Sequence, residues 1–202
     1  MSIRFLAALF VVVALMSPAP PATAASYTFE ATLTGSSEHP PVASPGTGFA
    51  RVILDTIAHT LEIYAEFAGL LAPTTVAHIH APTALPFAGN VGIAVQPPTL
   101  SGFPAEVTAG TYLNTFDTSV SATYNTAYLT TYGFGDPLAA EAALLGDLMA
   151  GRAYFNIHTT AYPAGEIRGF FRAPAPIPLP PAMPFLLTAL GALWLLRRRR
   201  AV

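Results

Sequence analysis

Short stretches in which apolar and polar residues alternate run through most of this chain, and they constrain its fold more than any other feature. Clear cases are Tyr27–Thr34 and Leu61–Phe67. A period of two is typical of a β-strand with one buried face, so Leu61, Ile63 and Phe67 are expected to point into a core. The same reasoning predicts further strands at 49–55, 76–80, 91–96, 111–117, 152–159 and 166–172.

One segment has the pattern of a helix instead. Asp136 is a good N-cap, Pro137 suits the first turn, and residues 138–150 are strong helix formers that Gly151 can terminate. Many short strands, turns rich in Gly and Pro, and a single helix indicate an all-β fold: an antiparallel β-sandwich or barrel with one helix.

The two ends of the chain have a different composition from its body. An early arginine, an apolar run and the small residues Ala22-Thr23-Ala24 predict a secretory signal peptide over residues 1–24, and residues 25–173 then form the β domain. The alternative is a buried N-terminal helix. The absence of cysteine excludes disulfides and thiol chemistry outside the cytoplasm, so a packed core must stabilise the domain.

The C-terminus has three parts. Residues 174–182 form a stiff, proline-rich spacer, and residues 183–196 form a hydrophobic span that is short against the roughly 20 residues of a transmembrane helix. The basic tail, residues 197–202, contains Arg197, Arg198, Arg199 and Arg200 and marks a cytoplasmic side. An ordinary stop-transfer anchor is one explanation of this end.

Removing both ends changes the charge of the protein. The body keeps four of the nine arginines and all eleven acidic residues, a formal net charge of −7 against −2 for the whole chain. Such a charge argues against nucleic acid as a partner and is compatible with cation binding or simple solubility.

Three of the five histidines lie in two of the predicted strands, within Ala77–Pro82 and Asn156–Gly169. The spacing places His78 and His80 on one strand face. His158 from another strand would complete a copper or zinc site with an open position. The alternative is that the three histidines are hydrogen-bonded structural groups.

Two further polar motifs have structural explanations. Glu166 and Arg168 are two residues apart, so they can pair with each other or with a neighbouring strand, and they are expected to fix the turn at Pro163–Gly165. Glu38 lies beside His39 in a loop whose two prolines fix the path of the chain. No serine elbow, P-loop, dinucleotide-binding glycine motif or HExxH motif is present.

The body resembles the CHRD domain, a family first described in chordin and widespread in bacterial exported proteins. The resemblance rests on motifs spread over almost the whole body: Phe29-x-Ala31-x-Leu33-x-Gly35-x-x-Glu38-x-Pro40-Pro41, Gly48-x-Ala50, Leu61-x-Ile63, Gly69-Leu70, Ala77-His78-Ile79-His80-Ala81-Pro82, Tyr154-x-Asn156-Ile157-His158-Thr159 and Pro163-x-Gly165-Glu166-Ile167-Arg168-Gly169. It implies an immunoglobulin-like β fold and no settled activity. The sequence departs from the family's pattern after His80, where Ala81 replaces a frequent glycine, and residues 118–140 look like an insertion.

The C-terminus resembles the VPLPA variant of the PEP-CTERM sorting signals of Gram-negative bacteria. The motif residues are Ile177, Pro178, Leu179, Pro180 and Ala182, with isoleucine in place of the leading valine and one extra proline. This resemblance implies a precursor anchored transiently in the inner membrane. An exosortase-type protease would remove the tail, leaving the protein at the envelope surface or outside the cell.

These observations lead to three hypotheses. The first is an exported, non-enzymatic surface or matrix protein with no cofactor, for which an exopolysaccharide is a candidate partner and nucleic acid is not. The second is a mononuclear copper- or zinc-binding domain. The third is a redox enzyme of dismutase type, because copper–zinc superoxide dismutases also use His-x-His on a β-sandwich; this rests on analogy alone.

Overall fold

Alternating residues form strands throughout the part of the chain that this computed structural model describes, residues 26–96 and 98–174. There are eight: β1 (Ser26–Thr34), β2 (Thr47–Asp55), β3 (Thr60–Ala68), β4 (Thr74–His80), β5 (Ile93–Val95), β6 (Gly110–Asp117), β7 (Tyr154–Thr159) and β8 (Ile167–Phe170). They correspond to the strands expected from the sequence, although β5 is shorter than the predicted 91–96.

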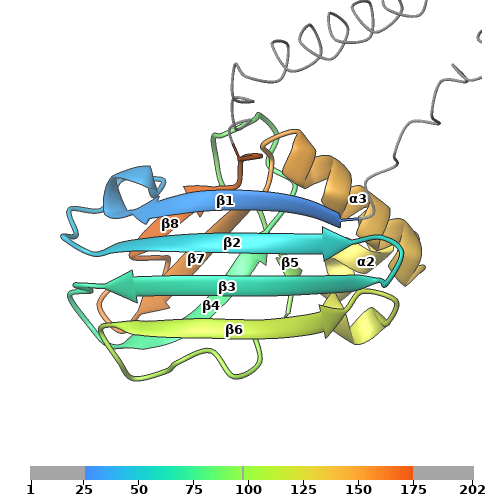
Figure 1. Cartoon of the computed structure of the whole chain (residues 1–202). Coiled ribbons are helices and arrows are strands. Elements are labelled where there is room, and N and C mark those ends of the chain that lie inside the picture. The colour runs from blue at the N-terminus through green and yellow to red at the C-terminus, as the bar shows by residue number, and fades with distance from the viewer. Residues whose placement is uncertain (1–25, 97, 175–202) are drawn as a thin grey trace, which may run out of the picture.

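The strands form one antiparallel sheet in the order β5-β4-β7-β8-β1-β2-β3-β6. The sheet curls into a half-barrel, so that β1, β2, β3 and β6 make one layer and β8, β7, β4 and β5 lie behind it (Figure 1). The layers meet at β1 and β8, which pair only at Thr34 and Arg168, with an isolated bridge between Glu30 and Arg172. The all-β prediction is confirmed.

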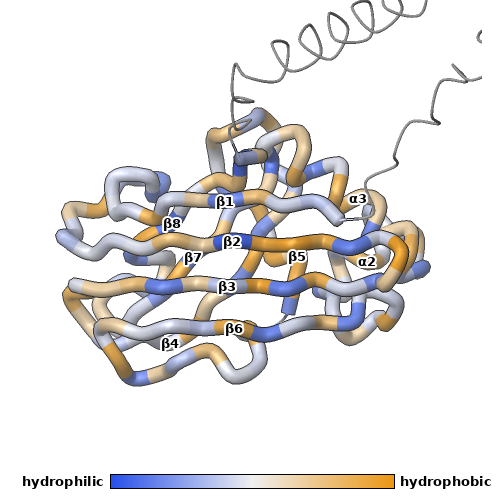
Figure 2. Tube along the Cα trace, viewed as in Figure 1, coloured by the Kyte–Doolittle hydropathy of each residue, from blue (hydrophilic) through white to orange (hydrophobic). Residues whose placement is uncertain are grey.

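The inner faces of the two layers enclose the core. Leu61, Ile63 and Phe67 of β3 are buried as the alternation predicts. Ile79 of β4 and Ile157 of β7 face the same core and are 1 % and 0 % exposed. Colouring by hydropathy shows the alternation along the strands (Figure 2).

Within the described residues, two α-helices, not one, accompany the sheet. The predicted helix is α3 (Pro137–Met149), which Asp136 caps by accepting a hydrogen bond from the backbone N–H of Leu138 at 2.9 Å. The second is α2 (Thr126–Tyr132), capped by Asn125. It lies in the part of the predicted insertion, residues 118–140, that precedes Asp136 and for which no helix was predicted. The 3₁₀ turns η1 (Gly35–Ser37) and η2 (Ser121–Thr123) complete the elements.

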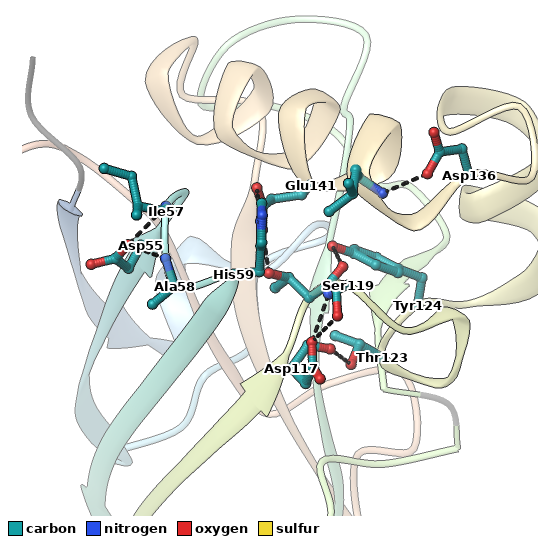
Figure 3. Close-up of polar contacts among 12 residues, drawn as sticks. Asp55, Ile57, Ala58, His59, Asp117, Ser119, Thr123, Tyr124, Asp136 and Glu141 are labelled. Atoms are coloured by element: carbon teal, nitrogen blue, oxygen red, sulfur yellow. Dashed lines mark hydrogen bonds and ion pairs between the residues drawn. The ribbon is translucent and has the colours of Figure 1, made fainter.

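Helix α3 is fastened to one end of the sheet by a polar cluster. Nδ1 of His59, in the β2–β3 turn, is 3.1 Å from Oε2 of the buried Glu141 of α3 (Figure 3). The Thr118 hydroxyl donates a hydrogen bond to the same oxygen. Tyr124 donates its hydroxyl to the carbonyl of Thr118 at 3.0 Å. This cluster ties the turn, the helix and the end of β6 together.

The predicted terminal segments lie outside the described residues. These are the signal peptide at 1–24, the spacer at 174–182 except Pro174, the hydrophobic span at 183–196 and the basic tail at 197–202. Between residues 26 and 174, without residue 97, no helix is long and apolar enough to cross a membrane.

Candidate metal centre

The outer face of strands β4, β7 and β8 carries polar side chains but is not exposed to solvent. Register pairs His78 with Asn156 and Asn156 with Arg168, which makes a polar row across the three strands. Every residue of β7 is buried. A strand with one wet face was expected here; instead, loops close over the polar side chains.

The three candidate histidines converge beneath these loops. His78, His80 and His158 are only 4 %, 8 % and 8 % exposed, and one ring nitrogen of each lies within 4.8 Å of the other two. The shortest separation, 3.3 Å, joins His78 Nδ1 and His158 Nε2. Cross-strand pairing of His158 with Val76 and the two-residue spacing on β4 place the rings side by side.

Backbone carbonyls fix the orientation and tautomer of each ring. His78 Nε2 lies 2.6 Å from the carbonyl oxygen of Pro98, His80 Nδ1 lies 2.8 Å from that of Val91, and His158 Nδ1 lies 2.9 Å from that of Pro163. A carbonyl can only accept, so each of these nitrogens carries the N–H of its neutral ring.

The remaining nitrogens are therefore three lone pairs that share one buried space. His78 Nδ1 and His158 Nε2 face each other without a proton between them, and His80 Nε2 has no hydrogen-bond partner among the described residues. Orphaned buried acceptors are costly unless something donates to them or binds them. A metal cation meets this need, and a carbonyl bonded to the second nitrogen is the usual support of a metal-bound histidine.

Burial also holds the rings in the state that binds metal. It lowers the pKa of His78 and of His80 to about 4, and it lowers the pKa of His158. The three imidazoles are therefore neutral at physiological pH. The largest separation between the three ring nitrogens is 4.8 Å. In a tetrahedral site with metal–nitrogen bonds of about 2.0–2.1 Å, two ligand nitrogens lie roughly 3.3 Å apart. The rings must therefore move slightly closer together to bind an ion.

Tyr154 supports the cluster, and the sequence analysis did not single it out. Its ring stacks on His80 with centroids 4.7 Å apart and an interplanar angle of 4°. The guanidinium carbon of Arg168 also lies over this ring, 4.8 Å from its centroid. The signal was present in the sequence, because Tyr154 shares the strand face of Asn156 and His158 by its two-residue spacing.

Glu166 and Arg168 are both buried, but they do not form the pair that was one prediction for them. The Glu166 carboxylate accepts hydrogen bonds from Ser44 Oγ at 2.6 Å, the Leu71 amide at 2.7 Å and Thr159 Oγ1 at 2.7 Å. The bond from Thr159 spans the turn at Pro163–Gly165. Arg168 lies in the row of His78 and Asn156, whereas Glu166 is bonded to groups of the loops at Ser44 and Leu71.

Arg168 instead holds the loop that carries Glu38. Its Nε donates to the Ser37 carbonyl at 2.5 Å, and Nε lies 3.7 Å from the buried Glu38 Oε2. Burial raises the pKa of Glu38 to about 7, although the Arg168 charge opposes this. Glu38 Oε1 and Asn156 Oδ1 have no partner among the described residues, and both approach Gly165 so closely that a Cβ there would lie within 2.7 Å of them.

Replacing Glu38 with glutamine is expected to remove a pH-dependent loss of stability. The folded protein holds the Glu38 proton more tightly than the unfolded chain, so the contribution of Glu38 to stability falls as pH rises from about 4.5 to 7. The variant has no such loss. Its free energy of unfolding relative to the parent should therefore rise by about 1–3 kcal/mol between pH 5 and pH 8. Urea unfolding of parent and variant at both pH values measures this difference in free energy. A difference between the two proteins that does not change with pH would contradict the prediction.

The fold and the cluster together define an all-β domain whose polar sheet face is closed by loops over three histidines. This chain belongs to the CHRD domain family, which matches residues 29–171. No curated protein and no solved structure gave a match.

Proposed function

We propose that this chain is an exported CHRD domain protein that binds one copper or zinc ion through His78, His80 and His158. The observation that carries the proposal is the set of three unprotonated nitrogens in one buried space, each on a ring whose other nitrogen bonds a backbone carbonyl. Neutral imidazole suits both metals. Metal binding, the second hypothesis from the sequence, thus has the strongest structural support.

The proposal is for a binding protein and not for an enzyme. In the described part of the chain, no aspartate or glutamate belongs to the cluster. A bound ion would therefore be held by three neutral imidazoles, with no carboxylate among its ligands. The dismutase-type hypothesis receives no further support from these contacts.

Metal content provides the test. Protein purified from its native envelope and equilibrated with Cu(II) or Zn(II) is expected to retain about one ion per chain after dialysis, because three fixed histidines form a single site. Elemental analysis measures the ratio. If the protein retains no metal either as purified or after equilibration with Cu(II) or Zn(II), the three histidines have a structural role.

Export and sorting form the second part of the proposal and rest on the sequence. The signal peptide features, the proline-rich spacer and the arginine tail support an inner-membrane precursor processed by an exosortase-type protease. An acidic body of charge −7 is compatible with a protein that concentrates cations at the envelope surface.

Processing at both ends is expected in the mature protein. Mass spectrometry should find its N-terminus near Ala25 and its C-terminus near Pro180, because the signal peptide and the sorting tail are removed. If most molecules instead retain Arg197–Arg200, the tail is an ordinary anchor.

A further inference from the structure

A cleft of about 660 Å³ lies where the two layers of the sheet meet, apart from the histidine cluster. Strands β1 and β8, the turn η1 and residues 87–89 enclose it, and its lining includes Glu30, Glu38, Arg168, Phe170 and Arg172. The cleft lies beside β1–β8 contacts at Thr34–Arg168 and Glu30–Arg172. None of the three clustered histidines lines it.

Arg172 contributes an exposed guanidinium to the lining of this cleft. Its guanidinium lies 3.7 Å from the ring centroid of Phe87, so the ring supports one face of the cation. Phe87 itself is held at a φ of +56°, a conformation that a bulky residue rarely adopts. Among the residues that the structure describes, the Arg172 guanidinium has no hydrogen bond and no ion pair.

Arg168 adds a second guanidinium to the lining of the cleft. Its Nε and Nη1 donate to the carbonyls of Ser37 and Gly89 and to Oδ1 of Asn90, and its side chain also bonds that of Tyr154. Two of the body's four arginines thus meet at one cleft of an acidic domain. Arg168 is buried and Arg172 is exposed. Guanidinium groups bind carboxylates through paired, charge-assisted hydrogen bonds.

The other residues that line the cleft indicate which further chemical groups a carboxylate ligand would carry. Glu30 and Glu38 offset the two arginines, which disfavours a dianion such as phosphate and leaves acceptors for hydroxyl groups. Ser36 and Ser37 add hydroxyls, and Phe49 and Phe170 add apolar surface. The volume is within the range of small-molecule sites. A monoanion with several hydroxyls and an apolar ring face fits these groups.

We propose that this cleft binds a sugar acid through its carboxylate, held by Arg172 and Arg168, with the sugar hydroxyls on Glu30, Ser36 and Ser37. The carboxylate can belong to a free sugar acid or to a uronate residue of an acidic polysaccharide. None of the three proposed metal ligands lines the cleft, so uronate binding and metal binding are tested separately.

Binding of galacturonate and of polygalacturonate to the full-length protein tests the proposal, with dextran and inorganic phosphate as comparison ligands. Arg172→Ala is expected to weaken uronate binding about ten-fold or more, because a charge-assisted bidentate contact is lost. Arg172→Lys should recover only part of it, since lysine lacks the planar fork. Arg51→Ala is the matched control: Arg51 also lies over a ring, Tyr64, at 5.7 Å and pairs with Glu62, but it is outside the cleft.

Uronate binding that Arg172→Ala weakens and Arg51→Ala leaves within about two-fold supports the site, and the tighter of the two uronate ligands identifies its source. Equal binding of phosphate or dextran overturns the assigned ligand class. Failure of either uronate to bind, unchanged binding in Arg172→Ala, or equal losses in both variants overturns the proposal and leaves the metal centre unaffected.

Discussion

Replacing Ile157 with alanine is expected to lower the free energy of unfolding by about 2–5 kcal/mol. Ile157 is fully buried between the two layers of the sheet, so the truncation removes apolar contacts and leaves a cavity that the surrounding strands cannot close. Ile79→Ala, on the neighbouring strand, should cost a similar amount. Urea unfolding monitored by circular dichroism measures both losses.

The chain offers a matched control for this substitution. Ile57 lies in the β2–β3 turn and is 76 % exposed, so Ile57→Ala should change stability by less than about 0.5 kcal/mol. A loss below that value for Ile157→Ala would mean that the strand faces are assigned the wrong way round.

Replacing His80 with alanine is expected to weaken copper or zinc binding by at least about 100-fold, because one of three ligands is removed. Competition with a chelator of known affinity measures the change. His39→Ala is the control, since His39 is exposed and outside the cluster. The His80 variant must first be shown to fold, by its thermal unfolding without metal. A folded variant that retains the parent's affinity would rule out the site.

The pH dependence of this binding follows from burial. The ordinary pKa of histidine predicts that affinity falls as pH drops through about 6.5. Burial lowers the pKa of His78 and His80 to about 4, so the folded site remains neutral further into acid. In the metal-free fold, the contribution of His78 and His80 to stability should fall as pH drops from about 6.5 towards 4, because in that window only the unfolded histidines take up protons; this is opposite in sign to the contribution of Glu38.

Alternation along the strands is a local property, and it was sufficient to predict most of the fold. Because side chains on a strand alternate between two faces, the sequence of β3 was enough to place Leu61 and Ile63 in the core. The same argument paired His78 with His80 on one face. The N-cap residue Asp136 and the proline after it located the start of α3.

The cover over the polar face could not be predicted in this way. Alternation shows that β4 and β7 have a polar face, but not whether loops cross it. The closure depends on bonds between distant residues, such as Arg168 to the carbonyl of Ser37, 131 positions earlier. For the same reason the sequence left the partners of Glu166 open, because Ser44 and Leu71 come from remote loops.

Helix α2 was missed because its signal is weak. Its seven residues include three threonines and two tyrosines, which are poor helix formers. Packing of Tyr128 beneath Tyr124, and the bond from the Tyr128 hydroxyl to Asp147 of α3, stabilise the helix instead. These are tertiary contacts that local composition does not reveal.

The X-ray absorption spectrum of the bound metal tests the central claim most directly. Full-length protein loaded with one equivalent of Cu(II) or Zn(II) is expected to show three imidazole nitrogens at about 2.0–2.1 Å, with a fourth position open to solvent or a small ligand. The spectrum of the His80→Ala variant should lose one imidazole. A metal environment of oxygen ligands without imidazole scattering would contradict the assignment of His78, His80 and His158 as the metal centre.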